Sequence, residues 1–140
     1  MKHSTQQSGF TFIELMVITV IIGIVSSIAM KTYQGYIARV QVTAGLAEIY
    51  PARTMLETRL NDDANAEISA IIIGLQSSTE NCLAITAHTN EEGAGKISCT
   101  HRGSSYIHGR TSTLNRSTLG KWHCTSTVEA EYTTAKCSGV

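Results

Sequence analysis

The chain has 140 residues, which is enough for one domain with a modest hydrophobic core. Eleven basic residues balance eleven acidic ones, so bulk charge does not indicate a nucleic-acid-binding protein. Four cysteines lie in the C-terminal half of the chain. An even number of cysteines behind an export-like N-terminus predicts two disulfides in an oxidising compartment, and the three pairings stay open at this point.

The first element is an apolar run over residues 10–30 that carries one acidic residue, Glu14. At about 1.5 Å per residue, a helix of this length spans a bilayer core of roughly 30 Å. A carboxylate is costly in such a segment, so Glu14 is expected to be functional and to have a partner. The small residue Gly9 precedes the run, whereas an ordinary signal peptide has its small-residue cleavage site after it. An uncleaved signal anchor is the alternative reading on physical grounds.

The helical pattern continues from this run through residues 31–60. Arg53 interrupts the apolar stripe, and Pro51 predicts a kink near residues 47–51 because proline lacks a backbone donor and crowds the preceding turn. The sequence NDDAN at 61–65 predicts the end of the helix. The stripe recurs at helical spacing, at Val42, Leu46, Ile49, Leu56 and Leu60.

The C-terminal half is rich in Thr, Ser and Gly and predicts short strands at 83–87, 96–100, 105–107 and 127–132. Residues 71–73 are either a short strand or a buried loop anchor. We therefore expect an α+β fold, in which the amphipathic part of one long N-terminal helix packs on an antiparallel sheet of about four strands. No grouping of nucleophile, base and orienting residue can be assembled, so an enzyme, a cofactor and a metal site are not expected.

The N-terminal segment closely resembles that of type IV pilins, over residues 9–42, in the sequence GFTFIELMVITVIIGI followed by YQGYIARVQV. The resemblance implies that a prepilin peptidase cleaves the chain after Gly9 and that Phe10 is then N-methylated. It also implies that Glu14, with Thr11 beside it, pairs with the N-terminal amine of a neighbouring subunit during assembly. Two positions differ from the usual pattern: Ser8 replaces a basic residue, and Lys31 replaces a proline that bends the helix.

The resemblance further implies a leader at 1–9, a membrane-spanning and filament-core half-helix at 10–36, and a globular head at 37–140. The precursor is expected in the inner membrane with a periplasmic head. An assembly platform and motor would then polymerise it into an extracellular helical homopolymer for twitching motility, surface adhesion and DNA uptake. The interpretation is a major pilin of the type IVa branch. The alternatives are a DNA-binding competence pilin and a minor pilin.

The C-terminal region resembles the disulfide-closed loop of type IVa pilins, which implies a Cys124–Cys137 bridge and leaves Cys82–Cys99 as the second. In some adhesive pilins this loop contacts host glycolipids; otherwise the disulfide only fastens the last strand to the sheet. The candidate receptor loop consists of Thr125, Ser126, Thr127, Val128, Glu129, Ala130, Glu131, Tyr132, Thr133, Thr134, Ala135 and Lys136.

Charge is segregated along the head. Residues 48–92 contain eight acids and two arginines, whereas residues 93–128 contain five basic residues and no acid. One hypothesis is a basic stripe that binds DNA phosphates. The other is complementary packing, in which the acidic loop of one subunit faces the basic sheet of a neighbour. The candidate DNA contacts are Arg102, Arg110, Arg116 and Lys121.

Overall fold

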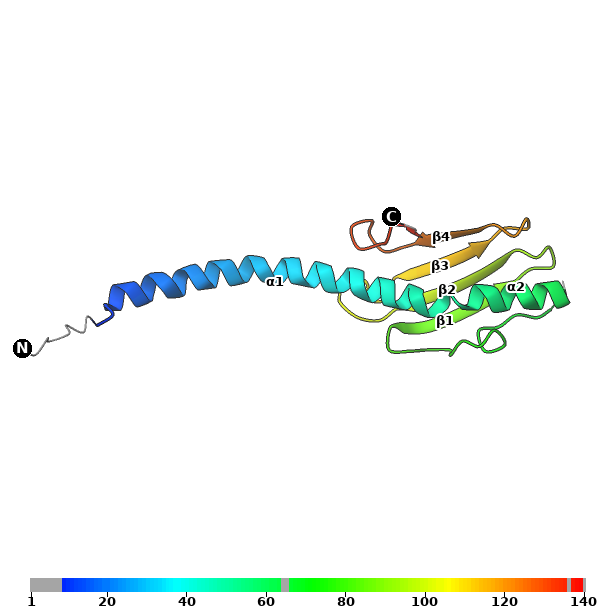
Figure 1. Cartoon of the computed structure of the whole chain (residues 1–140), viewed down its shortest axis with the longest axis horizontal. Coiled ribbons are helices and arrows are strands. Elements are labelled where there is room, and N and C mark those ends of the chain that lie inside the picture. The colour runs from blue at the N-terminus through cyan, green and yellow to red at the C-terminus, as the bar shows by residue number, and fades with distance from the viewer. Residues whose placement is uncertain (1–8, 64–65, 136, 140) are drawn as a thin grey trace, which may run out of the picture. The chain divides into compact units, whose positions relative to one another are not determined.

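The computed structural model describes residues 9–63, 66–135 and 137–139. The first element is helix α1, Phe12–Ile49, which begins directly after Thr11 and runs without interruption past Gly23 and Lys31 (Figure 1). By its internal contacts the chain divides into two compact units, with the boundary between Tyr33 and Gln34, so α1 contributes to both. The first unit therefore contains the N-terminal part of α1. The second unit, residues 34–140, contains all other elements, and from here on we call it the head.

Helix α1 ends at Ile49 and helix α2, Ala52–Asp62, follows after Tyr50 and Pro51. Pro51 has φ near −62° and no N–H, so the carbonyl of Ala47 cannot receive the helical hydrogen bond that a different residue would donate. The N–H groups of Arg53 and Thr54 instead bond to the carbonyls of Tyr50 and Pro51. The kink predicted near 47–51 is thus a short break, and α2 ends within the predicted NDDAN stop.

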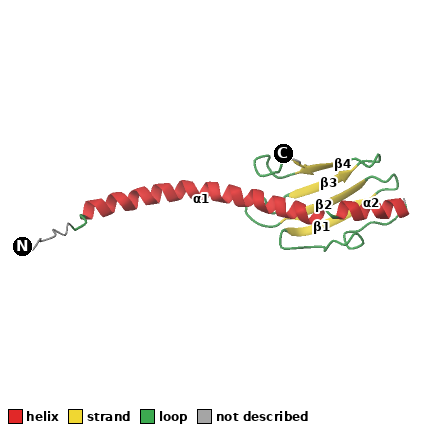
Figure 2. Ribbon diagram, viewed as in Figure 1, coloured by secondary structure: helices red, strands yellow, loops and turns green. Residues whose placement is uncertain are grey.

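The head contains a sheet in the order β1-β2-β3-β4-β5, whose first four strands are antiparallel (Figure 2). The short last strand pairs parallel with β4. The predicted α+β class and antiparallel four-stranded sheet are confirmed, with β5 as an addition. The strands are β1 Cys82–Thr89, β2 Gly95–His101, β3 Thr111–Arg116, β4 Trp122–Ser126 and β5 Cys137–Ser138.

The core of the head lies between the helices and one face of this sheet, as alternation along the strands requires. Paired residues Ala87, Ile97, Leu114 and Cys124 are all buried, and they come from β1, β2, β3 and β4 in turn. The helices supply the predicted stripe, whose five apolar members are all buried: Val42, Leu46, Ile49, Leu56 and Leu60.

Two of the four strand predictions are wrong. Residues 105–107 form turns, in which Ile107 is a single buried anchor between Gly103 and Gly109, both with positive φ. Residues 127–132 follow the last antiparallel strand and form bends and turns, with Val128 buried. The true strands β3 and β4 escaped prediction because one large apolar residue in each, Leu114 or Trp122, gives little alternation to detect. At 71–73 the chain turns, and only Ile73 is buried, which favours the loop-anchor alternative.

Two disulfides fasten the head. Cys82–Cys99 joins β1 to β2 and is fully buried. Cys124–Cys137 joins β4 to β5 and closes the predicted C-terminal loop. In the described part of the chain no cysteine is free. A closed loop of this size stabilises the folded head by about 3 kcal/mol on an entropic account, so the covalent framework compensates for a modest core.

Candidate assembly site and surfaces of the head

Glu14 caps the first turn of α1. Its Oε2 accepts hydrogen bonds from the backbone N–H and from the hydroxyl of Thr11, both at 3.1 Å. In return the N–H of Glu14 donates to the Thr11 hydroxyl at 3.4 Å. This reciprocal arrangement is a capping box, which places Thr11 at the N-cap and Glu14 three residues on. The T-x-x-E spacing that defines it is visible in the sequence.

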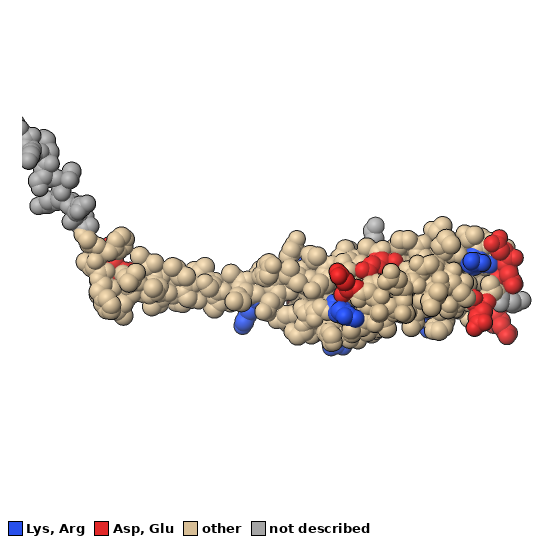
Figure 3. Space-filling model, turned by 90° about the horizontal axis from the view of Figure 1, so that it is seen from below, with Lys and Arg blue, Asp and Glu red and all other residues tan. Residues whose placement is uncertain are grey.

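The capping box engages Oε2 of Glu14 but does not neutralise its charge, since residues 9–30 contain no basic residue. Around it the surface is apolar: Phe10 is 80 % exposed, and every large apolar side chain from Phe12 to Met30 is exposed as well. In Figure 3 the N-terminal part of α1 is almost free of coloured charge, and the charged side chains gather over the head. An uncompensated carboxylate in an exposed apolar stretch is suited to a cationic partner from another molecule.

The predicted processing position is accessible. Gly9 has no neighbouring atom within 4 Å of where a side chain would start, and Phe10 precedes the helix. Ser8 and the rest of the predicted leader lie outside the described residues. By length and composition alone, the described residues contain one helical stretch, Phe12–Asp62, apolar enough to cross a membrane, with a hydropathy of 2.4 over its best 18-residue window.

The C-terminal loop is packed onto the head rather than projecting freely. Arg39 of α1 donates from Nε to the carbonyl of Glu131 at 2.7 Å. The rings of Tyr106 and Tyr132 are 5.2 Å apart, and Tyr132 is buried. Burial and the nearby acidic groups raise the pKa of the Tyr132 hydroxyl. Ser126 and Val128 are buried too, and Lys136 lies outside the described residues. A receptor could therefore reach only part of the predicted loop, chiefly Thr125, Thr127, Glu129, Ala130, Glu131 and Ala135.

The four predicted DNA contacts do not form one stripe. Arg102 and Arg110 are exposed at the two ends of the β2–β3 connection. Arg116 lies at the other end of β3, and its side chain is only 12 % exposed because it forms an ion pair with Glu57 of α2 at 2.8 Å. Lys121 is exposed in the following turn. The structure thus uses Arg116 inside the head. Arg102 and Arg110 flank the neck of one connection, where the N–H of His101 bonds to the carbonyl of Arg110, and Lys121 lies beyond the other end of β3.

Glu57 accepts from two nitrogens of Arg116 and from the indole N–H of Trp122, at 2.7 to 2.8 Å. These hydrogen bonds, led by that from Arg116, lower the pKa of Glu57 against the opposing effect of burial. The same contact raises the pKa of Arg116. Bidentate pairs of this kind fix geometry as well as charge, so Glu57 ties α2 to β3 and β4. Sequence could not reveal this pair, because its members are 59 residues apart.

A buried polar chain crosses the core beneath Gly45. His101 is fully buried and its Nε2 is 2.8 Å from the hydroxyl of Ser112, which is 2.9 Å from that of Ser126. Ser126 in turn accepts the N–H of Val128. On the other side, Nδ1 of His101 is 3.7 Å from the sulfur of Cys99. Burial lowers the pKa of His101, because a low-dielectric surrounding disfavours the charged imidazolium.

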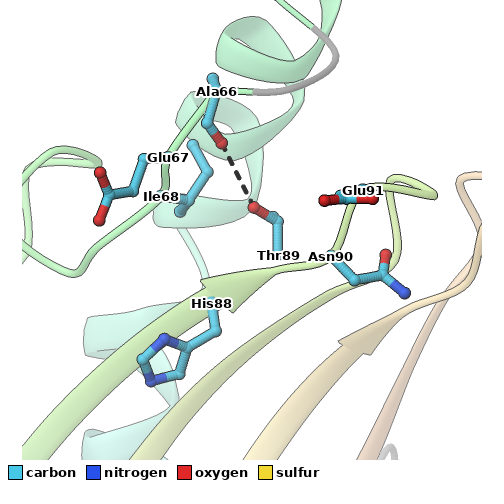
Figure 4. Close-up of a pocket in the computed structure, with 7 residues that line it drawn as sticks. All are labelled: Ala66, Glu67, Ile68, His88, Thr89, Asn90 and Glu91. Carbon is cyan, nitrogen blue, oxygen red and sulfur yellow. Dashed lines mark hydrogen bonds between the residues drawn. The ribbon is translucent and has the colours of Figure 1, made fainter.

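A surface depression of about 360 Å³ lies where the segment after α2 passes the end of β1. Figure 4 shows Glu67 and Glu91 on either side of the hydrogen bond from the Thr89 hydroxyl to the carbonyl of Ala66. The two carboxylates are not brought to one point. In the described residues no group of three or more His, Cys, Asp or Glu side chains is placed to hold a metal ion. We therefore assign no ligand to this depression.

An apolar, acid-bearing half-helix that leads into a disulfide-fastened α+β head is suited to a protein whose N-terminal stretch is covered by lipid or by other subunits. Residues 38–138 match the pilin family of bacterial filament proteins, and residues 4–30 match the prokaryotic N-terminal methylation motif. The chain belongs to the pilin family, as a type IV pilin. The family is structural and not enzymatic.

Similar proteins include a "Type IV major fimbrial protein FimA" of Dichelobacter nodosus, 34 % identical over 94 % of this chain and 96 % of that protein. A "Probable minor fimbrial protein" of the same organism is 33 % identical over 92 % and 93 %. A "Fimbrial protein" of Pseudomonas aeruginosa is 33 % identical over 84 % of each chain. The crystal structure of a Cs1 pilin chimera has the same fold, with a TM-score of 0.61 at 19 % identity, over 74 % of this chain and 98 % of that one.

Proposed function

We propose that this chain is the main structural subunit of a type IV pilus. Its precursor is held in the inner membrane by residues 10–36 with the head on the periplasmic side. Prepilin peptidase cuts after Gly9 and methylates Phe10, and the assembly platform and motor add the mature subunit to the filament. The single observation that supports this most is the exposed apolar surface of residues 12–33, which water cannot solvate and which neighbouring copies would bury.

In the proposed filament the new amine at Phe10 of one subunit lies beside Glu14 of the next. The amine and the carboxylate compensate each other in an apolar core where neither is stable alone. Twitching motility, attachment and DNA uptake are functions that such a retractable fibre would serve. The exposed part of the C-terminal loop is the candidate surface for a host glycan.

Glu14 has two roles to separate, because it caps its own helix and is proposed to pair with a neighbour. Glu14→Gln keeps a side-chain acceptor suited to the capping box but removes the charge. Thr11→Val removes the capping hydroxyl but keeps the charge. Expressed in cells, Glu14→Gln should yield a processed, membrane-bound subunit with few or no sheared filaments, whereas Thr11→Val should still assemble. Normal filament yield from Glu14→Gln would contradict the pairing.

A minor subunit is the second candidate, because a relative named as a probable minor fimbrial protein is nearly as similar as the major one. The number of copies per sheared filament separates the two. A chain that makes up most of the filament mass is the major subunit, and one present at a few copies is a minor subunit. A DNA-binding pilin is less well supported, since Arg116 is paired with Glu57 and Lys121 lies at the opposite end of β3 from Arg102 and Arg110.

A further inference from the structure

Arg53 stands in the apolar stripe of the helices, at a position that the spacing assigns to the core. The structure places it half-buried, with its guanidinium carbon 5.0 Å from the ring centre of Trp122 and 5.8 Å from that of Tyr50. Cation–π contacts of this kind hold a guanidinium in place without using its N–H donors. Two aromatic faces therefore fix the direction of the Arg53 side chain.

The donors of this guanidinium are unused. Nε of Arg53 is buried without a hydrogen-bond partner, and among the described residues no acceptor is hydrogen-bonded to its other nitrogens. The nearest carboxylate, Glu57, is already occupied by Arg116 and Trp122. Buried N–H groups are normally paired, so an arginine whose Nε is held in position without a hydrogen-bond partner can take a further acceptor, although its charge already acts on Glu57.

Arg53 opens onto a cup of about 320 Å³, which we call the Arg53 cup and which is lined by Tyr50, Arg53, Thr54, Glu57 and Trp122. This volume is at the lower end of the range for small-molecule sites, and it suits a ligand with one ring. The lining holds one arginine and one carboxylate, and Arg116, which is bonded to Glu57 from outside the lining, brings the local net charge to a single positive charge. That charge balances one carboxylate, whereas a doubly charged phosphate would be repelled by Glu57.

We infer that the Arg53 cup binds an acidic sugar of the hexuronate type. The guanidinium of Arg53 receives the carboxylate through two parallel N–H···O bonds, the contact for which its planar fork is suited. The parts of Tyr50 and Trp122 that Arg53 does not cover contact the C–H groups of the sugar ring, and the hydroxyl of Thr54 pairs with a ring hydroxyl. This site contains no residue of the C-terminal loop, although Tyr50 also lines a neighbouring depression with Thr134 of that loop, and it does not depend on filament formation.

The test uses the fluorescence of Trp122, which is the only tryptophan of the chain and lies in the cup. The full-length protein in detergent micelles is titrated with glucuronate, and with glucose as the neutral control. We expect a saturable change in fluorescence with glucuronate only, at low salt, and a loss of this change as salt is raised.

Arg53→Gln should weaken glucuronate binding about tenfold or more, because it removes a charge-assisted pair. Arg53→Lys keeps the charge but not the fork and should bind with intermediate affinity. Arg59→Gln, on the exposed side of the same helix, is the matched control and should bind as the parent does. The thermal midpoint of each variant shows whether the head is folded.

Equal responses to glucuronate and glucose, or unchanged affinity in a folded Arg53→Gln variant, would overturn the site. If glucuronate does not bind and Arg53→Gln also blocks filament formation, the cup takes a carboxylate from a second copy of the chain, and the sugar proposal fails. Normal filaments from Arg53→Gln with lost glucuronate binding support the site. Failure of the proposed pilus function would appear instead as an absence of filaments in the parent protein.

Discussion

Apolar side chains are exposed on the N-terminal part of α1 and buried in the core of the head. From Phe12 to Met30 every large apolar side chain is exposed, whereas in the head the stripe from Val42 to Leu60 is buried against the sheet. Helix α1 carries both exposed and buried apolar side chains, so helical structure alone does not decide which of them are covered. The comparison teaches that the head completes its own core, while the N-terminal stretch requires lipid or neighbouring copies to cover it.

The largest effect is expected from a charge placed in the exposed apolar stretch. Ile21 is 54 % exposed in the middle of this stretch. An aspartate there costs roughly 2.5–3.5 kcal/mol in a membrane and has no partner in a filament core. Ile21→Asp should therefore abolish filaments, measured as subunit in the sheared fraction, and Ile21→Val should not. Wild-type filament yield from Ile21→Asp would contradict the contrast between the two regions.

The head should be most sensitive to loss of its covalent framework. Replacing Cys124 and Cys137 together by Ala opens the bridge between β4 and β5. The free energy of unfolding should fall by about 3 kcal/mol, measured by urea titration of the detergent-solubilised chain. Membrane insertion should be unchanged, because the N-terminal stretch has no cysteine. A stability loss well under 1 kcal/mol would show that packing alone holds β5.

Two glycines of α1 allow a matched comparison. A side chain at Gly45 would begin 2.8 Å from Nδ1 of His101 and 3.1 Å from the sulfur of Cys99, whereas Gly23 has nothing within 4 Å. Gly45→Ala should destabilise the head by about 1–3 kcal/mol through overpacking. Gly23→Ala should leave the thermal midpoint of the head unchanged. Equal midpoints for the two variants would mean that α1 moves away from the sheet at little cost.

The smallest effect is a dependence on pH. Because burial lowers the pKa of His101, the unfolded chain binds a proton at higher pH than the folded chain does. Stability is therefore fully present above the unfolded value of about 6.5 and is lost as pH falls, by at most about 1.4 kcal/mol per pH unit for one proton. The thermal midpoint should fall between pH 7 and pH 5, and His101→Gln should flatten this fall. If the thermal midpoint of a folded His101→Gln variant falls with pH as steeply as that of the parent, the pH dependence arises from other groups.

Sequence reasoning succeeded where local chemistry decides the structure. Pro51 interrupts any helix, and the apolar spacing from Val42 to Leu60 specifies the buried face regardless of what packs against it. It failed for β3, whose sequence TSTLNR contains one large apolar residue. Such a strand forms because β2 and β4 pair with it on either side, and its own sequence has no pattern that predicts this pairing.

The candidate functional residues also divide into those that the sequence could indicate and those that only the structure reveals. The family resemblance pointed to Glu14, and its T-x-x-E capping partner Thr11 was within reach of the sequence. Arg116 appeared to be a free surface cation, because charge counts do not reveal a partner on α2. Arg53 could be seen only as an interruption in a stripe. Its two aromatic neighbours become visible once α2 and β4 are placed together.

The capping box has a consequence for the energetics of growth and shrinkage of the proposed filament. Glu14 accepts both bonds from Thr11 through Oε2, so an amine could approach Oε1 while the capping box stays closed. The carboxylate is therefore held in one direction before any neighbour arrives. In the proposed filament this fixed direction would set the axial register of subunits, and apolar contact would supply most of the cohesion. A departing subunit would keep the same first turn of α1 and would be ready to add again.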